Sequence, residues 1–201
     1  VVVALLALAS SLSERASFWA GVLFGLSPLG LTSSLLATTD GGFVLFWLLS
    51  QLLLVRLQGW PRAVGLGLAV SCGALWKWSI YLFWIPCVIA WGQDPRRTPL
   101  WWRQWLAGVA ISLLGLLPSL YWNAQHGWLT FRHVAGSVLP QASESSSPNP
   151  LDFLAAQIAL LPPLLFAPFV CALINAWRHW KALSWPLKSC FVSAVVPLGL
   201  V

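Results

Sequence analysis

The sequence predicts an all-α protein, a polytopic transmembrane helical bundle. Of its 201 residues, 59% are hydrophobic and only 8% are charged, and the mean hydropathy is +0.80. Long apolar runs are interrupted about every 20 residues, which is the length that an α-helix needs to cross the hydrocarbon layer. The alternation typical of a transmembrane β-barrel strand does not occur. The composition therefore excludes an ordinary soluble domain.

Apolar runs along the chain predict about eight membrane segments. The chain begins at Val1 inside one such run and stops inside another, so we expect 1–201 to be a partial transmembrane domain whose first and last segments are incomplete. Proline and tryptophan at segment ends fit helix breaks and interfacial anchors. The expected segments are 1–11, 17–36, 42–57, 63–76, 78–91, 104–121, 151–175 and 190–201.

The stretch 63–91 is either one long helix or two short ones that meet at "WKW", residues 76–78. With a hairpin here, nine of the 11 basic residues lie on one side and only Lys77 and Arg132 on the other, whereas a single crossing erases this bias. The positive-inside rule therefore favours the hairpin and makes the nine-residue face cytoplasmic. The net charge of +6 then reflects contact with anionic lipid, and no nucleic acid is expected as a partner. The nine residues are Arg15, Arg56, Arg62, Arg96, Arg97, Arg103, Arg178, Lys181 and Lys188.

The same orientation places Asp40, Lys77 and a loop at 122–150 on the extracytoplasmic face. Each hairpin arm spans about 21 Å, which is less than the roughly 30 Å of the hydrocarbon layer. We therefore expect Lys77 to be recessed between two tryptophans in a polar pocket. A lysine at that depth is costly unless it is paired, and an anionic ligand is the functional default. The alternative is a lysine that extends to the surface and binds no ligand.

Three polar clusters converge on this face, and together they predict a binding site. They are "TTDGG" with Asp40, "WKW" with Lys77, and "YWNAQHGWLTFRH" with Asn123, His126, Arg132 and His133. A carboxylate, a lysine, an arginine and two imidazoles can hold a phosphate and manage a proton. Aromatic rings among them can stack on a sugar.

Each polar residue also has a structural interpretation that the sequence leaves open. Asp40 can cap the helix that follows it. Asn123 can cap or turn the chain, and His126 can be a solvated loop residue. Arg132 and His133 can face lipid phosphates without belonging to any site.

The order of motifs resembles the GT-C glycosyltransferases of the protein O-mannosyltransferase and lipid A aminoarabinose transferase superfamily. "TTDGGFVLFWLLSQLLLVRL" resembles the acidic loop of that family with the span that follows it, and "GLGLAVSCGALWKWSIYLFWIPCVI" resembles its glycine-rich helix, its lysine flanked by aromatic residues and its next helix. "LPSLYWNAQHGWLTFRHVAGS" is similar to its Trp-Asn segment, and "LDFLAAQIALLPPLLF" to the span after that. The resemblance covers roughly residues 17 to 175.

This resemblance implies an integral multi-pass enzyme of the bacterial inner (plasma) membrane. Such enzymes are inverting transferases that move a sugar from a polyprenyl-phosphate donor to a lipid, protein or glycan acceptor at the extracytoplasmic face. The family places its general base in a loop that would precede Val1, so the 201 residues alone are expected to be inactive. No resident cofactor is implied, and use of a divalent metal ion stays open, because His126, His133 and Asp40 have no fixed ligand spacing.

The resemblance assigns roles to particular positions of this chain. Asp40 matches the family's second loop acid and is expected to support the catalytic base or orient the donor. Lys77 matches the lysine at the hairpin apex, where we expect contact with the donor phosphate. Arg132 and His133 stand where the family has polar residues near the phosphate. Asn123 matches the Trp-Asn pair and, like His126, is a candidate for substrate binding.

Two other classes of protein fit the composition. A multi-pass transporter or lipid flippase also uses intramembrane lysine and acidic residues, although the sequence shows no internal repeat and its charges gather at one face and not at the midplane. A scaffold subunit without catalytic activity is the third possibility.

Overall fold

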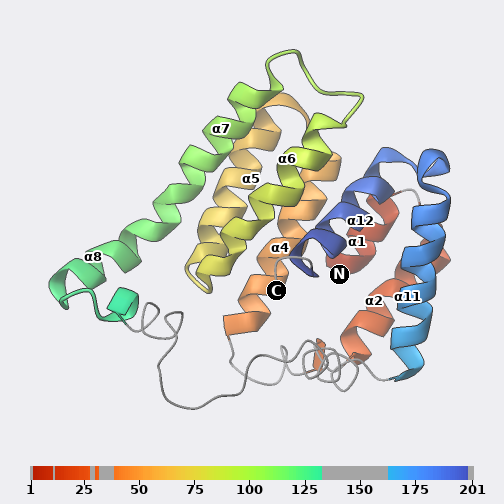
Figure 1. Cartoon of the computed structure of the whole chain (residues 1–201), viewed down its shortest axis with the longest axis horizontal. Helices are drawn as coiled ribbons and strands as arrows, with labels where there is room; N and C mark the ends of the chain where they lie inside the picture. The colour runs from red at the N-terminus through yellow and green to blue at the C-terminus, as the bar shows by residue number, and fades with distance from the viewer. Residues whose placement is uncertain (1, 11, 28–29, 32–38, 133–162, 199–201) are drawn as a thin grey trace, which may run out of the picture.

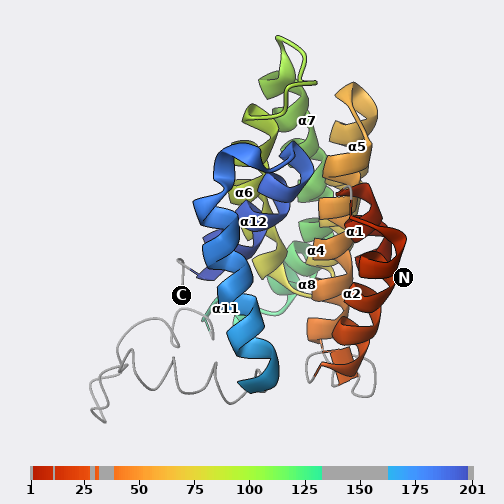
Figure 2. The same ribbon diagram turned by 90° about the vertical axis from the view of Figure 1, so that its right-hand side faces the viewer.

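The computed structural model describes residues 2–10, 12–27, 30–31, 39–132 and 163–198. Within these ranges every regular element is a helix and none is a strand, which confirms the predicted all-α class. The helices pack side by side, with α1, α2, α11 and α12 on one side of a central group formed by α4, α5, α6 and α7 (Figure 1). The turned view places α4 between α12 and α1 (Figure 2).

The first two helices are short and pack against each other and against α4. Helix α1 covers Val2–Ala9, and α2 covers Glu14–Leu26. The side chain of Ser13 caps α2, since its hydroxyl accepts a hydrogen bond from the amide of Ala16 at 3.3 Å. Much of the outer surface of α2 is apolar, because Phe18, Trp19 and Leu26 are exposed.

Helices α4 (Thr39–Arg56) and α5 (Gly59–Ala74) form the centre of the molecule. The connection between them is only two residues long. Gly59 adopts a φ of 58°, a left-handed conformation that glycine tolerates without a steric penalty, and this lets the chain reverse sharply.

The predicted hairpin is confirmed. Helix α5 ends at Ala74, the chain turns through residues 75–77, and it returns as the 3₁₀ helix η1 (Trp78–Phe83) and then α6 (Trp84–Gly92). Ile80 and Phe83 of the returning arm are fully buried against α5 and α4. Their burial holds the two arms together and fixes the position of the turn. The core of the molecule consists of Leu54, Ala63, Leu66, Val70, Ala74, Ile80, Phe83, Trp84, Cys87, Ala90 and Trp91.

The longest helical stretch runs from residue 101 to residue 125 and packs against α5. It comprises α7 (Trp101–Ser112), the 3₁₀ turn η2 (Leu113–Leu116) and α8 (Leu117–Gln125). Pro118 lies in the first turn of α8, where a missing amide hydrogen costs nothing.

Glycines explain how closely α5 and α7 approach each other. A Cβ placed on Gly67 would lie 2.7 Å from the Cβ of Ile111, and one placed on Gly115 would overlap the backbone carbonyl of Ser71. Small residues at a helix interface allow the backbones to come close, which is a common way of packing helices in a membrane. We call this contact, made by Gly67, Gly108 and Gly115, the glycine seam.

The C-terminal helices add a second side to the bundle. They are α11 (Pro163–Arg178), the 3₁₀ turn η3 (Trp180–Ala182) and α12 (Trp185–Leu198). The indole of Trp185 donates a hydrogen bond to the carbonyl oxygen of Ala90 at 2.8 Å and so ties α12 to α6.

A buried polar contact ties α12 to α4. Gln51 donates to the hydroxyl of Ser189 and accepts from that of Ser193, both at 2.6 Å, and all three side chains are at least 94% buried. Because both functional groups of the amide are satisfied, this contact fixes the two helices without leaving a buried polar group unpaired.

Two described helices are long and apolar enough to cross a membrane, Thr39–Arg56 and Trp101–Gln125. The other predicted segments correspond to helices too, although residues 1, 11, 28–29, 32–36, 151–162 and 199–201 of these segments lie outside the described ranges. The number of segments that cross a membrane stays a prediction.

An ion cluster around the fully buried carboxylate of Asp94 joins α5 to the loop between α6 and α7. A carboxylate oxygen of Asp94 lies 2.5 Å from the guanidinium of Arg62, and the other lies 3.1 Å from Nε of Arg96. Arg96 also donates to the backbone carbonyl of Val55 at 3.1 Å. Burial raises the pKa of the Asp94 carboxyl, but the hydrogen bonds from Arg96 and Arg62 outweigh it and hold that pKa below its ordinary value.

Candidate functional site

An ion pair between Asp40 and Lys77 is the centre of the candidate site. The Nζ of Lys77 donates to Oδ1 of Asp40 at 2.8 Å. Both side chains are about half exposed, at 48% and 50%. Asp40 lies in the first turn of α4 and Lys77 at the tip of the hairpin, so the pair joins two of the three clusters that the sequence predicts to converge.

The second glycine of "TTDGG" explains why the two residues meet. The indole ring of Trp76 lies directly on Gly42, two residues after Asp40 in α4, and a Cβ at Gly42 would overlap the ring. The ring of Phe43 lies 6.0 Å from Nζ of Lys77. The absence of a side chain at Gly42 therefore lets the hairpin tip dock on α4, and the docking places the ammonium group beside the carboxylate.

A cavity of about 480 Å³ opens beside Lys77. One wall is the hairpin tip, and the other is the face of η2 and α8 that lies against this tip. Three tryptophans, one serine and Lys77 are among the residues that line it. The lining residues are Ala74, Leu75, Trp76, Lys77, Trp78, Gly115, Pro118, Ser119 and Trp122.

The wall from η2 and α8 was missed by the sequence analysis, although the sequence carries a signal for it. Residues 115, 118, 119 and 122 follow the i, i+3, i+4, i+7 spacing that puts side chains on one face of a helix. In "GLLPSLYW" this face is small, polar and then aromatic, unlike the leucines around it. A helix face of that kind indicates a cavity wall more than it indicates contact with lipid.

Asn123 is fully buried and holds the turn that follows α8. Its Nδ2 donates to the carbonyl oxygen of Ser119 at 2.9 Å, and its Oδ1 accepts from the amide of Thr130 at 3.0 Å. The turn contains Gly127 and Trp128 with φ values of 64° and 59°. A tryptophan in the left-handed region is strained, so the Asn123 contacts must stabilise this turn.

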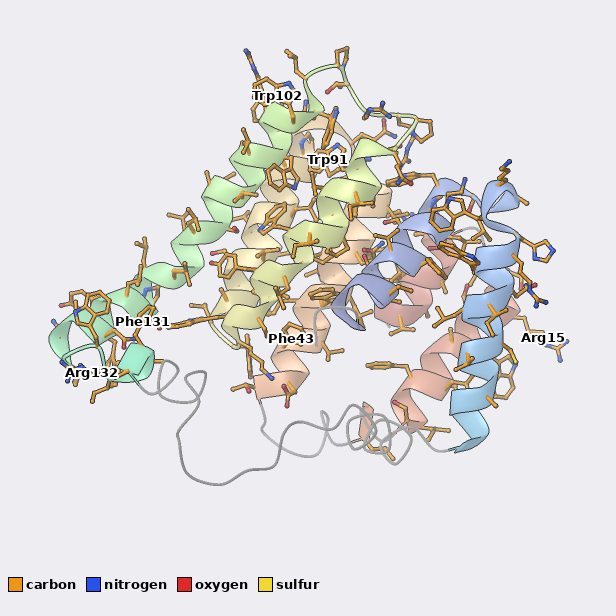
Figure 3. All side chains as sticks on the ribbon, viewed as in Figure 1. Arg15, Phe43, Trp91, Trp102, Phe131 and Arg132 are labelled. Atoms are coloured by element: carbon orange, nitrogen blue, oxygen red, sulfur yellow. The ribbon has the colours of Figure 1, made fainter. Side chains whose placement is uncertain are left out.

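His126 and Arg132 lie on the exposed surface of the same turn. The imidazole of His126 stacks on Trp122, with ring centroids 4.3 Å apart and planes at 11°, and its Nδ1 lies 2.8 Å from the carbonyl oxygen of Trp122. Figure 3 shows Arg132 at the outer end of this segment, well away from Phe43 at the lower end of α4.

The structure therefore brings together some of the predicted residues and not others. Asp40 and Lys77 are in direct contact, and Trp122 and Phe131 link the third cluster to them, since Phe131 lies 5.2 Å from the ring of Trp78. Arg132 has no side-chain contact with the Asp40–Lys77 pair. His133 and the rest of the predicted loop at 122–150, from 133 onward, lie outside the described residues.

The site combines a cation, a carboxylate and flat aromatic surfaces. A lysine ammonium can bind an oxyanion, and indole rings can pack against the apolar face of a sugar or an isoprenoid chain. Among the described residues, no three His, Cys, Asp or Glu side chains lie close enough together to hold a metal ion.

Comparison with known proteins relates the chain to a glycosyltransferase. It is 29% identical over 165 residues to the lipid A galacturonosyltransferase RgtD of Rhizobium johnstonii, and the match covers 80% of this chain and 34% of the relative. The chain thus spans about a third of the length of that relative. No family model and no solved structure matches the chain.

Proposed function

We propose that the chain belongs to a membrane glycosyltransferase of the GT-C class, which transfers a sugar from a polyprenyl-phosphate donor to a lipid acceptor at the extracytoplasmic face. The observation that supports it most is the Asp40–Lys77 pair at the edge of an aromatic cavity of about 480 Å³. The similarity to a lipid A galacturonosyltransferase favours sugar transfer and a lipid acceptor.

The proposed topology follows from the two ends of the bundle. The start of α4, the hairpin tip and α8 lie at one end, and the α4–α5 connection and the α6–α7 loop lie at the other (Figure 1). Asp40 and Lys77 belong to the first end, whereas Arg56, Arg96 and Arg97 belong to the second. We assign the second end to the cytoplasm, by the positive-inside rule.

In the proposed mechanism, Lys77 binds the phosphate of the donor. As the glycosidic bond breaks, negative charge grows on the departing polyprenyl phosphate, and a fixed cation beside it lowers the barrier. The tryptophans of the cavity hold the sugar and the first isoprene units.

Asp40 has a supporting role in this proposal. When a phosphate oxygen replaces it on Lys77, its carboxylate becomes free to accept a hydrogen bond from the sugar. The general base, which activates the acceptor from the opposite side and so inverts the anomeric carbon, is expected outside these residues, as the family resemblance implies. Asn123 positions the aromatic turn, and His126, Arg132 and His133 are proposed to contact substrate at its outer edge.

Binding of undecaprenyl phosphate to the intact protein tests this proposal. Lys77→Ala should weaken binding by roughly tenfold or more, since a hydrogen bond to a charged group contributes about 1.5–3 kcal/mol. Lys77→Arg should retain most of the affinity, because it keeps the charge. Lys181→Ala, an exposed lysine between α11 and α12, is the matched control. Undiminished affinity in Lys77→Ala would remove Lys77 from the donor site.

A further inference from the structure

A second charged site lies at the end of the bundle opposite the Asp40–Lys77 pair. Two adjoining hollows, of about 340 and 460 Å³, open on the α6–α7 loop and the first turn of α7. They share Thr98 and Pro99. The smaller hollow contains Arg103 and the larger one Arg97. The remaining lining residues are Trp60, Leu100 and Gln104 in the smaller hollow and Pro95 and Trp101 in the larger.

The arginines of these hollows have no acidic partner among the described residues. The nearby carboxylate, that of Asp94, is fully buried and already binds Arg62 and Arg96. Arg97 donates only to the backbone carbonyl of Asp94, at 3.3 Å, and Arg103 rests on the ring of Trp102, 5.2 Å from its centroid. Both guanidinium groups are thus available to an anion from outside.

A buried amide adds a further donor to the smaller hollow. Gln104 is only 7% exposed, and its Oε1 accepts from the hydroxyl of Thr98 at 3.4 Å. Its Nε2 has no partner in the part of the chain that the structure describes, although the residue lines the hollow. Prolines at 95 and 99 fix φ at two positions of the loop that carries these groups, which lowers the entropy lost when a ligand orders it.

Exposed apolar side chains beside the arginines indicate what kind of anion binds. Trp60, Leu100 and Trp102 are 57%, 51% and 47% exposed. Leu100 and Trp102 stand at the start of Trp101–Gln125, one of the two helices long enough to cross a membrane, and Trp60 lies in the first turn of α5 beside them. Tryptophan at such a position anchors a protein at the lipid interface, and arginine binds a phosphate through paired N–H groups.

We propose that these hollows bind the head group of an anionic phospholipid on the face opposite the sugar-transfer site. Arg97 and Arg103 hold the phosphodiester, Gln104 donates to one of its oxygens, and Trp60 and Trp102 pack beside the upper acyl chains. The proposal requires only that the chain resides in a membrane. It does not depend on which reaction the protein catalyses.

Native mass spectrometry of the detergent-solubilised intact protein tests the site. The wild type should retain phosphatidylglycerol in preference to phosphatidylcholine with the same acyl chains. Arg97→Gln/Arg103→Gln should reduce the retention of phosphatidylglycerol at least about fivefold, since each arginine near an anionic lipid surface contributes to binding. The double variant Arg97→Lys/Arg103→Lys keeps the charge and loses the paired N–H groups of arginine. Its retention of phosphatidylglycerol should lie between that of the wild type and that of Arg97→Gln/Arg103→Gln.

A charge-matched variant decides whether the effect is local. Arg15 and Arg178 are exposed and lie on α2 and α11, so Arg15→Gln/Arg178→Gln removes the same charge elsewhere and should reduce retention far less than Arg97→Gln/Arg103→Gln does. Equal losses in both Gln variants, or no loss in either, would overturn the proposal. Displacement of the lipid by an equal concentration of sn-glycerol 3-phosphate would also overturn it, because the site would then bind a soluble anion.

Discussion

Asp40 and Lys77 are oppositely charged and about half exposed, so their attraction contributes little to folding. Exposed ion pairs typically contribute about 0–1 kcal/mol. A phosphate can therefore replace Asp40 on the ammonium group without a large loss of stability. A pair this weak suits a site that must exchange one anion for another.

Asp40→Asn should separate donor binding from sugar transfer. The variant removes the anion that competes for Lys77, so we expect it to bind undecaprenyl phosphate at least as tightly as the wild type. Transfer of sugar should fall, because the freed carboxylate is absent. Titration of both proteins with the lipid, alongside a transfer assay in membranes, checks this. Weakened binding, as in Lys77→Ala, would mean that Asp40 serves only to hold the lysine in place.

Asp94 differs from Asp40 because its side chain is fully buried between two arginines. Asp94→Asn leaves buried positive charge uncompensated and should lower the free energy of unfolding by about 3 kcal/mol at pH 7. Denaturant unfolding in detergent measures this. Asp40→Asn, with its half-exposed carboxylate, should lower that free energy by less than about 1 kcal/mol.

The same residue predicts how stability depends on pH. The pKa of Asp94 is lower in the folded protein than in the unfolded chain, so its stabilisation is present above the unfolded pKa of about 4 and is lost as the pH falls through the folded pKa. The difference in unfolding free energy between wild type and Asp94→Asn should therefore shrink as the pH is lowered from about 5 to about 3, across the ordinary pKa of an aspartate. A difference that stays constant would contradict the assignment.

At the scale of helices, the glycine seam sets the distance between α5 and α7. Gly115→Ala should destabilise the protein by about 1–3 kcal/mol, because the added methyl group overlaps the backbone carbonyl of Ser71 and only a backbone shift can relieve it. Gly25→Ala in α2 is the matched control. A Cβ there meets no atom within 4 Å, so the change should be neutral or stabilising. Thermal unfolding of both variants in detergent distinguishes these outcomes.

The hairpin and the convergence of Asp40 and Lys77 could be predicted, because the distribution of basic residues indicates which connections lie at the same end of the bundle. Their direct ion pair was not predicted. The predicted proximity of Arg132 to Lys77 is not found, since no side-chain contact joins them among the described residues. Charge bias orders residues along the membrane normal, but it says nothing about their separation within the plane. The ion cluster around Asp94 was missed, because no local pattern indicates that its carboxylate will bind Arg62, which lies 32 residues earlier in α5.

At the scale of the whole molecule, the proposed orientation places residues 93 and 126 on opposite sides of the membrane. Both Gln93 and His126 are exposed, so single cysteines there should react in a background without the four native cysteines. A membrane-impermeant maleimide should label His126→Cys in intact cells and Gln93→Cys only after the cells are opened. Labelling in the reverse order would invert the topology, and equal labelling of both in intact cells would contradict a bundle that crosses the membrane.

The contact between Gly115 and the Ser71 carbonyl also limits how the proposed donor cavity can evolve. Gly115 belongs to the cavity wall, and the main chain of Ser71 lies directly behind it. A substitution to a smaller side chain therefore cannot enlarge the cavity at this position. Under the proposed function, homologues that take a bulkier sugar should gain the space by replacing Trp76, Trp78 or Trp122. Differences in selectivity among such homologues should map to these three positions, while position 115 should stay glycine.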